Sequence, residues 1–539
     1  MSSRSNFLYS IREHQFILKE WLDVGHIMSL PKFKDYYSLD DIDAILEQAL
    51  KVAKEIVAPS CDDAEGVGVK FEGGKVTVPQ SFKDAYHFLQ ENGWGMHDPE
   101  EPGVLPHIVQ AACREYFTGA NNTVSLLTEG AARLIATYGR AEDKARYLPK
   151  MYKGKWGGTM CLTETGAGTD VGASVTKAFA TETPQVYRIK GIKNFITGGD
   201  HDYTENIIHL LLARIEGGAP GTRGLSLFIV PKIWVKEDGT LGEPNDVITL
   251  NIEHKMGIKG SVTAMLGFGE NDNCLGILLG NPPNEKGFAE GIAQMFQMMN
   301  SARHTVGQIG LVLSTVAYNN AVQYAKERIQ GKAMTNPKGP DVPIIKHEDV
   351  RRMLLDQKAT IDAMRALIFK NWYYIDLAGH SSDPEERQMA SRHIQVLNPL
   401  GKAYCSDMAW ILIAEAIQVY GGYGFCEEYP VEKLARDSKI NSIWEGTNYV
   451  QSIDLVGRKW SLEGGALFSD WLAEVGRFIE SHAAAAGLED EFALLQKIYD
   501  AYREIYTTVI GYAKSNPRLV ATFATRVLHA TAMTYCGCL

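Results

Sequence analysis

Residues 160–171 read MCLTETGAGTDV, and they stand where the chain changes from a helical to a β-rich pattern. Gly166 and Gly168 let the backbone come close to a ligand, and the hydroxyls of Thr163 and Thr169 can hydrogen bond to one. Taken alone, the stretch is also typical of an ordinary glycine-rich turn. It is not a dinucleotide fingerprint, because no strand–Gly-x-Gly-x-x-Gly–helix unit surrounds it.

Runs rich in apolar and β-branched residues follow this stretch, at 186–190, 207–214 and 225–230. Clusters of Gly, Pro, Asp and Asn bound the runs, as they bound strands. No long helix alternates with these strands, which argues against a parallel, doubly wound sheet. The pattern predicts a compact antiparallel sheet or barrel.

Helical periodicity flanks the β-rich part on both sides. Before it, Ser38 and Asp41 give capping chemistry to the start of a predicted helix, and a turn or hairpin is expected at 71–76. Further helices are expected from Ser81, over 106–119 and over 123–138. After the β-rich part, long patterns with one apolar face predict a helical bundle over 289–310, 312–328, 348–377 and 385–420, with a proline-rich loop at 336–340.

The predicted fold class is therefore α+β, mainly α. Four domains are expected: an N-terminal helical domain with a leading arm (1–155), a central antiparallel β-barrel-like domain (156–283), a C-terminal helical bundle (284–460) and a helical extension (461–539).

Bulk composition limits the classes of function. At 539 residues the chain is too long for one hydrophobic core, and its net charge of -11 argues against a general nucleic-acid binder, which is usually basic. The eight cysteines do not repeat with the spacing of a zinc site, so we expect reduced thiols, a cytoplasmic protein and no metal site. No stretch approaches the roughly 18 apolar residues of a membrane span.

Three further segments carry candidate chemistry. Residues 193–199 (KNFITGG) take a predicted strand into an aromatic, a hydroxyl and two glycines. Residues 418–425 (QVYGGYGF) place glycines after a long helix, as a C-cap and sharp loop do. Residues 443–448 (IWEGTN) set one carboxylate, Glu445, beside apolar residues that would raise its pKa and suit it as a base. Each segment also has a plain structural explanation, and a lone Glu on a loop is more often a solvated surface residue.

The order and spacing of the four segments resemble the acyl-CoA dehydrogenase family. The family pattern includes Thr-Glu-x-Gly-Ala-Gly-Ser/Thr-Asp, Lys-x-Trp/Phe-Ile-Thr-Gly/Asn-Gly, Gln-x-x-Gly-Gly-x-Gly and Tyr-Glu-Gly-Thr. Residues 254–261 (HKMGIKGS) are similar to the family's Lys-Leu-Gly-x-Arg-x-Ser loop, and the resemblance covers roughly 80–460. The family fold is an N-terminal helical domain, a central β domain and a helical bundle. The added length is similar to the 3-methylmercaptopropionyl-CoA dehydrogenase-like branch.

The resemblance implies an FAD-dependent α,β-dehydrogenation of an acyl-CoA thioester. Glu445 would abstract the α-proton, flavin N5 would accept the β-hydride, and an electron-transferring flavoprotein would receive the electrons. The implied FAD contacts are Met160, Leu162, Thr163, Gly168, Thr169, Phe195, Ile196, Thr197, Arg328, Gln418, Gly421, Gly422, Thr447 and Asn448. The implied substrate contacts are Thr169, Asn300, Arg303, Trp444 and Gly446. Because some FAD contacts would come from a neighbouring subunit, a homodimer or a dimer of dimers is implied.

Some family members carry the base on another helix, at the position that Ala302 occupies here, which favours Glu445. Trp444 replaces a commoner Tyr and could reshape the acyl pocket; Thr165 replaces the usual Pro. An acyl-CoA oxidase that uses oxygen shares these motifs. The acidic balance and the retained base speak against a flavin-containing nucleic-acid-associated protein, and the retained base and flavin segments speak against a non-enzymatic scaffold. The acyl group and any follow-on step, such as decarboxylation, stay open.

Overall fold

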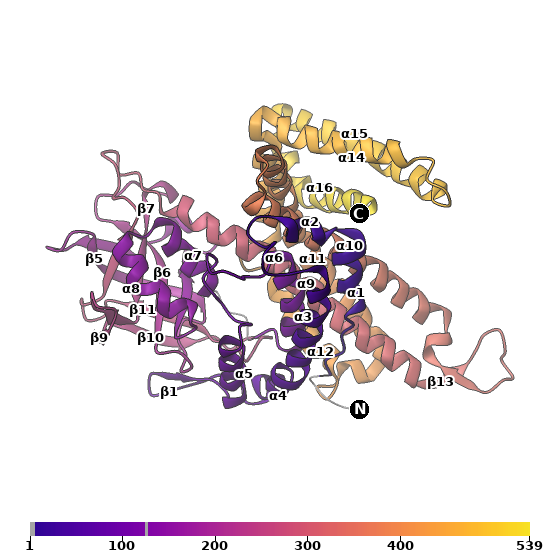
Figure 1. Cartoon of the computed structure of the whole chain (residues 1–539), viewed down its shortest axis with the longest axis horizontal. Coiled ribbons are helices and arrows are strands. Elements are labelled where there is room, and N and C mark those ends of the chain that lie inside the picture. Colours follow the sequence, from indigo (N-terminus) through magenta and orange to yellow (C-terminus); the bar gives the residue numbers. More distant parts are fainter. Residues whose placement is uncertain (1–5, 124–127) are drawn as a thin grey trace. The chain divides into compact units, whose positions relative to one another are not determined.

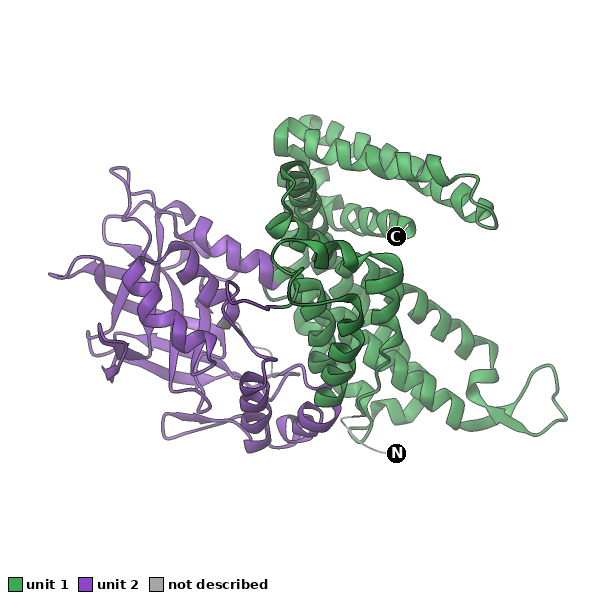
Figure 2. Cartoon of the chain, viewed as in Figure 1, with its two compact units in different colours: residues 1–53, 105–119, 303–539 green, residues 54–104, 120–302 purple. Residues whose placement is uncertain are grey.

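The computed structural model describes residues 6–123 and 128–539, and these form two compact units (Figures 1 and 2). Unit 1 comprises residues 1–53, 105–119 and 303–539, and unit 2 comprises residues 54–104 and 120–302. The predicted order of helices, a β-rich part and then long helices is confirmed. The division into four domains stays a prediction.

Unit 2 contains an eight-stranded sheet. Its strands are β3 (Trp156–Cys161), β4 (Lys177–Ala180), β5 (Val186–Thr197), β6 (Asn206–Ile215), β7 (Leu225–Pro231), β10 (Val247–Ile252), β11 (Thr263–Phe268) and β12 (Leu275–Leu279). Strand β4 pairs with both β5 and β6, so the path β5–β12–β7–β6 closes into the predicted barrel. Strands β11 and β10 continue the sheet from the second half of β5.

Two pairings differ from the antiparallel expectation. Strand β3 runs parallel to β6, from Trp156 opposite Asn206 to Cys161 opposite Leu211, and β4 also runs parallel to β6. Parallel neighbours need a long connection between them rather than a tight hairpin. The segment that carries β4 and β5 supplies that connection between β3 and β6.

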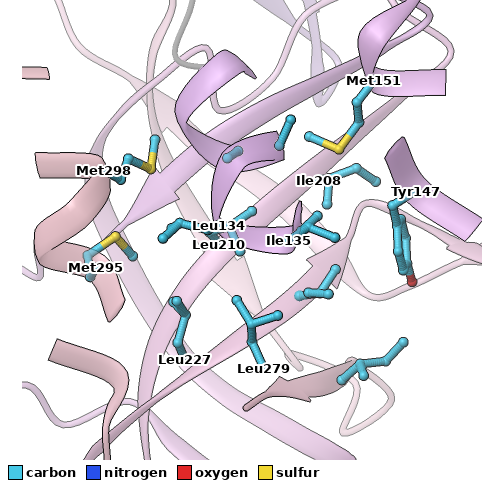
Figure 3. Close-up of a cluster of buried hydrophobic side chains, with 14 of the residues drawn as sticks. Leu134, Ile135, Tyr147, Met151, Ile208, Leu210, Leu227, Leu279, Met295 and Met298 are labelled. Carbon is cyan, nitrogen blue, oxygen red and sulfur yellow. The ribbon is translucent and has the colours of Figure 1, made fainter. Parts of the chain in front are cut away.

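The core of unit 2 lies between the barrel and the helices α7 (Thr128–Tyr138) and α8 (Ala141–Tyr152), as Figure 3 shows. Leu134 and Ile135 of α7 pack with barrel residues such as Leu210, and Met298 closes the same cluster. Every residue of β6 from Asn206 to Ala213 is buried, which explains its uninterrupted apolar run. The predicted helix at 123–138 is described from Thr128, and residues 124–127 lie outside the described part.

Smaller elements complete unit 2. They are η2 (Ala53–Val57), α4 (Pro59–Gly66), α5 (Gln80–Glu91), the hairpin of β1 (Lys70–Glu72) and β2 (Lys75–Thr77), and the pair β8 (Ile233–Val235) and β9 (Leu241–Pro244). The hairpin predicted at 71–76 is therefore confirmed.

Unit 1 is a helical bundle around α9 (Gly291–Glu327), α10 (Glu348–His380) and α11 (Pro384–Tyr420). Two helices were expected over 289–328, but α9 is continuous, so that prediction is wrong. A Cβ atom added at Gly310 would lie 2.8 Å from the Cys405 carbonyl oxygen. Gly310 therefore allows a close approach of α9 and α11 rather than a break in the helix.

The bundle is joined by shorter elements on both sides. They are α1 (Arg12–Gln15), η1 (Phe16–Trp21), α2 (Val24–Ser29), α3 (Leu39–Val52), α6 (His107–Ala120), α12 (Pro430–Ser438), η7 (Lys439–Ser442), α13 (Asn448–Ile453) and η8 (Asp454–Arg458). The cap predicted for α3 is confirmed, because the Asp41 carboxylate accepts hydrogen bonds from both the backbone N–H and the hydroxyl of Ser38.

An exposed hairpin of β13 (Ile329–Lys332) and β14 (Asp341–Pro343) follows α9, and the predicted proline-rich loop joins its strands. The predicted helical extension consists of α14 (Ala466–His482), α15 (Glu489–Ser515) and α16 (Pro517–Cys538), and α16 packs against α11 and α13. Across residues 6–123 and 128–539, none of the helices is both long enough and apolar enough to span a membrane.

A buried polar cluster ties the N-terminal arm to the bundle of unit 1. Glu115 of α6 accepts hydrogen bonds from the Tyr9 hydroxyl at 2.5 Å, and its carboxylate lies 3.0 Å from His14 Nε2. Arg365 of α10 donates to Thr315 at 2.8 Å and brings its Nε within 3.7 Å of the Glu115 carboxylate. The cation of Arg365 therefore compensates a carboxylate that water does not reach.

Arg365→Met should lower the free energy of unfolding of unit 1 by about 3–5 kcal/mol, because it leaves the charge of Glu115 buried without its cation. Arg352→Met on the same helix removes ion pairs of a half-exposed side chain and should cost at most about 1 kcal/mol. Urea denaturation followed by circular dichroism compares the two variants. Equal losses would contradict this account of the cluster.

Candidate active site

The segment that carries Glu445 is a tight turn between η7 and α13. Glu445 and Gly446 both adopt left-handed backbone conformations, with φ of 54° and 82°. That conformation is strained for a residue with a Cβ atom, and such strain persists only where surrounding contacts enforce it. Thr447 then caps α13, because its hydroxyl accepts a hydrogen bond from the backbone N–H of Val450.

Three side chains hold the carbonyl oxygens of this turn. Arg303 Nε of α9 donates to the Glu445 carbonyl oxygen at 3.3 Å. The Gly446 carbonyl oxygen accepts from Lys402 Nζ of α11 at 2.8 Å and from Gln451 Nε2 of α13 at 3.2 Å. Side chains from three helices of unit 1 thus fix the direction in which Glu445 leaves the backbone.

One oxygen of the Glu445 carboxylate is shielded from water, although the residue as a whole is half-buried. Its Oε2 atom is buried, and within the described part of the chain it has no hydrogen-bond partner. Burial raises the pKa of Glu445 to about 7, although the nearby cations of Arg303 and Lys402 lower it in part. A carboxyl group that is deprotonated only near neutral pH can act as a general base.

Charged groups around Arg303 complete the electrostatics of the turn. Arg303 is almost fully buried, and this burial lowers its pKa, while Asp454 and Glu445 oppose the shift and Arg458 adds to it. Ala302, directly before it, has no ionisable group. Of the two positions at which the family carries its base, only that of Glu445 holds an ionisable group in the described part of unit 1, and its raised pKa suits a base.

The glycine-rich loop of unit 2 follows β3, and a buried ion pair holds its first residues in place. Lys193 Nζ lies 2.8 Å from Glu164 Oε1 and donates to the Leu162 carbonyl oxygen at 3.0 Å. Glu164 also accepts hydrogen bonds from the backbone N–H groups of Val175 and Thr176. Burial opposes ionisation of Glu164, but Lys193 and these donors outweigh it and lower the pKa of Glu164 to about 2.

The loop and the end of β5 lie side by side, as their predicted roles require. The Asn194 backbone N–H donates to the Thr163 carbonyl oxygen at 2.8 Å. Phe195, the next residue, has a φ of 59° and a side chain that is 60% exposed. A Cβ atom added at Gly166 or Gly168 would meet nothing within 4 Å. An exposed aromatic ring beside an open glycine loop provides a surface for a planar ligand.

The remaining residues of these two segments support the loop or border it. Leu162 and Ile196 are buried, Met160, Thr163 and Thr197 are half-buried, and Thr169 is exposed. Residues 254–261 adjoin the same place, because the Gly198 backbone N–H donates to the Val262 carbonyl oxygen at 2.9 Å.

A second group of predicted FAD contacts gathers at the end of α11. Arg328 lies over the ring of Tyr423, with its guanidinium carbon 5.7 Å from the ring centroid. Gln418, Gly421 and Gly422 are exposed beside it in sequence, and a Cβ atom at either glycine would meet nothing within 4 Å. The structure therefore brings Arg328 to the glycine segment, on a surface that is open within this single chain.

Asn448 is the predicted FAD contact whose side chain has the most hydrogen bonds within unit 1. Its Oδ1 accepts from Lys402 Nζ, and its Nδ2 donates to Ser406 and Asp407. Of the predicted substrate contacts, Trp444 donates to Asn441 at 3.2 Å, and Asn300 lies half-buried on α9.

Sequence reasoning missed Lys402 and Gln451, because neither belongs to a recognisable motif. It also missed a group of three possible metal ligands, His107, Asp376 and His380, whose ligand atoms lie within 4.8 Å of one another. Both oxygens of Asp376 already accept hydrogen bonds from the backbone N–H groups of His107 and Ile108. Asp376 thus caps the N-terminus of α6, which explains its burial without a metal.

Two protein-family models match the chain: the acyl-CoA dehydrogenase middle domain over residues 159–270 and the acyl-CoA dehydrogenase C-terminal domain over residues 289–459. A butyryl-CoA dehydrogenase of Syntrophomonas wolfei is 46% identical over 541 residues, which cover 99% of this chain and 88% of that one. The chain belongs to the acyl-CoA dehydrogenase family. Its resemblance to the longer branch is also confirmed, because 3-methylmercaptopropionyl-CoA dehydrogenase of Ruegeria pomeroyi is 36% identical over 94% of this chain and 86% of that one.

The fold of this acyl-CoA dehydrogenase is similar to solved members of the family. An acyl-CoA dehydrogenase of Bacillus anthracis, solved in complex with FAD, gives a TM-score of 0.73 at 21% identity, covering 95% of this chain and 82% of that one. The match to the C-terminal domain model ends at residue 459, so the extension that contains α14, α15 and α16 lies beyond it.

Gly446→Ala should destabilise this acyl-CoA dehydrogenase by about 1–2 kcal/mol, because a Cβ atom is strained at its left-handed φ. The added atom would also lie 3.0 Å from Gln451 Nε2. Gly457→Ala is the control, since its Cβ atom would meet only Ile453 Cγ2, at 3.9 Å. We expect the midpoint of thermal unfolding to fall for the first variant and to hold or rise for the second. The opposite order would refute the strain at this turn.

Proposed function

We propose that this acyl-CoA dehydrogenase introduces a double bond between the α- and β-carbons of a short, unbranched acyl-CoA thioester, with Glu445 as the base and FAD as the hydride acceptor. The observation that carries the proposal is the Glu445 carboxylate, which has one buried oxygen without a hydrogen-bond partner, has its pKa raised to about 7 and stands on a strained turn. A solvated surface Glu has neither property.

The residues of the flavin segments fit an isoalloxazine ring. Exposed Phe195 offers an apolar face to such a ring, and the open space over Gly166 and Gly168 admits its polar edge. Thr163, Thr169 and Thr197 supply hydroxyl groups for its nitrogen and oxygen atoms. Arg328, with the open glycines 421 and 422, suits the pyrophosphate and adenosine parts of FAD, since a guanidinium pairs well with phosphate.

FAD supplies the acceptor for the hydride that leaves the β-carbon. The chain's own residues supply the other half of the reaction. Glu445 Oε2 takes the α-proton, which is the difficult step because a thioester is a weak carbon acid. Among the described residues, the backbone N–H of Glu445 has no acceptor, so it can donate to the thioester oxygen and stabilise the negative charge that develops there.

Arg303 and Lys402 contribute to the same step through charge. Both cations favour the carboxylate form of Glu445, so they keep a buried base available near neutral pH. Once Glu445 has taken the proton, the exclusion of water from Oε2 limits its exchange with solvent.

The name of a relative supports the acyl group, and the family resemblance supports the electron acceptor. The 46% identical relative from Syntrophomonas wolfei is named a butyryl-CoA dehydrogenase, which supports a short linear acyl chain. The electrons pass to an electron-transferring flavoprotein. The chain acts as a homodimer or a dimer of dimers, in which the exposed surface of Arg328, Gln418 and Gly422 meets the FAD of a neighbouring subunit.

Anaerobic addition of butyryl-CoA should bleach the flavin absorbance of the wild-type enzyme and yield crotonyl-CoA. Glu445→Gln should retain FAD and slow bleaching by about 10²-fold or more, because the base is removed while the fold is kept. Stopped-flow absorbance and product mass spectrometry measure both effects.

Glu480→Gln, an exposed carboxylate of α14, is the control and should bleach like the wild type. Near-normal bleaching by Glu445→Gln would refute the base. Rapid release of peroxide in air, with no transfer to an electron-transferring flavoprotein, would make the enzyme an oxidase instead.

The pH dependence of kcat/KM should report the raised pKa of Glu445. Only the deprotonated carboxylate can accept the α-proton, so the rate should rise with pH and reach half its maximum near the folded-state pKa of about 7. Steady-state kinetics from about pH 5 to about pH 9 test this. A half-maximum near the ordinary Glu value of about 4.3 would contradict it.

A further inference from the structure

A chain of hydrogen bonds leads from the turn that carries the candidate base to the last helix of unit 1, α16, which Figure 1 colours yellow. It begins at the Gly446 carbonyl oxygen, which accepts a hydrogen bond from Lys402 Nζ at 2.8 Å. The same ammonium group donates to Asn448 Oδ1 at 2.8 Å. Lys402 is fully buried on α11, so these two bonds are made away from water.

The chain continues through the other end of the Asn448 side chain. Asn448 Nδ2 donates to Asp407 Oδ1 at 2.7 Å, and Asp407 Oδ2 lies 2.9 Å from His529 Nε2. His529 belongs to α16, and its ring also meets the edge of Tyr404 on α11. Each polar group along this path thus faces a partner of opposite hydrogen-bonding character.

We propose that Lys402 is a positioning residue for Glu445, and that His529 of the C-terminal extension holds it in place through Asp407 and Asn448. The inference rests on the proposed role of Glu445 and extends it to His529, which lies beyond the family's C-terminal domain model. Lys402 acts on the base in two ways.

The first way is geometric. The left-handed conformation of Glu445 and Gly446 costs free energy, and the bond from Lys402 to the Gly446 carbonyl oxygen opposes its relaxation. Asn448 fixes the position of the Lys402 ammonium group, because its own amide group is hydrogen bonded at Oδ1 to Lys402 and at Nδ2 to Asp407 of α11. Loss of the His529 contact would increase the mobility of Asp407. That mobility would reach the turn only through Asn448 and Lys402.

The second way is electrostatic. Burial lowers the pKa of Lys402 to about 7, and the charges of Glu445 and Asp407 oppose this, while Arg303 adds to it. The charged groups that act on this pair are Arg303 from α9 and Asp407 from α11, and Asp454 and Arg458 from η8 act in turn on Arg303. The carboxylate form of Glu445 favours the protonated form of Lys402, and protonated Lys402 favours the carboxylate form of Glu445. The two groups therefore titrate as a linked pair.

The two ways can be separated with two variants. Lys402→Gln removes the charge, so the half-maximum of kcat/KM against pH should move to higher pH by up to about one unit, which is up to a tenfold weaker acid. His529→Ala keeps the charge and loosens the support, so kcat should fall about tenfold with the pH midpoint and KM unchanged. Turnover of butyryl-CoA with a ferricenium salt as electron acceptor measures both.

A readout independent of turnover follows the turn directly. His529→Ala should raise the amide hydrogen exchange of residues 443–451, whereas His482→Ala on α14 should not, because its ring bonds within its own helix to Phe478 and Ser481. Lys497→Gln, an exposed lysine of α15, is the matched control for Lys402→Gln and should leave the pH profile unchanged.

The outcomes distinguish this inference from the proposed function. If the wild type and Glu445→Gln turn over butyryl-CoA equally, the proposed function fails. If Glu445→Gln is inactive but Lys402→Gln keeps the wild-type pH profile, or His529→Ala keeps both wild-type kcat and wild-type exchange at 443–451, the positioning role is overturned while the proposed function stands. Since the His529 ring is partly exposed, its variant also provides a test that does not require replacement of a fully buried residue.

Discussion

The Glu445–Gly446 turn is the constraint on which the candidate site depends, since a strained backbone and a buried carboxylate oxygen without a hydrogen-bond partner both oppose folding there. Hydrogen bonds to its two carbonyl oxygens, from Arg303, Lys402 and Gln451, offset that cost. Each of the three donors comes from a different helix of unit 1. The three helices must therefore pack in one fixed arrangement for the turn to form. The packing of the bundle thus determines where the Glu445 side chain lies.

Unit 2 solves a similar problem in the same way. Lys193 is buried beneath the glycine loop, donates to the Leu162 carbonyl oxygen and pairs with Glu164. Lys402 likewise donates to a loop carbonyl oxygen and to a side-chain oxygen. A lysine suits this task because three N–H donors on a long stem can gather several acceptors at once. In both units a buried lysine holds the loop, but Lys193 opens a segment that the sequence already singles out, whereas Lys402 lies outside every recognisable motif.

That difference explains how far the sequence led. The barrel, the long helices and the segment of Glu445 were predictable, because apolar periodicity and short motifs report local structure. The parallel pairing of β3 with β6 was not, since strand direction depends on a connection that has no local pattern. The continuity of α9 through Gly310 was missed for a related reason: a glycine that permits close helix packing and a glycine that ends a helix look alike in sequence. The raised pKa of Glu445 was inferred from apolar neighbours, yet the cations that limit it, Arg303 and Lys402, lie 142 and 43 positions away.

The extension beyond residue 459 follows from the same reasoning. Its helix α16 packs against α11 and α13, the two helices that carry Lys402 and Gln451. Asp407 lies between them, on the face of α11 where both its oxygens are used, one by Asn448 and the other by His529. Without the histidine, the second oxygen of Asp407 would lose its hydrogen-bond partner. The extension and the bundle are therefore linked through Asp407, which Asn448 connects to Lys402. Helix α16, which lies beyond the family's C-terminal domain model, is in this way tied to the residues that hold the turn of Glu445.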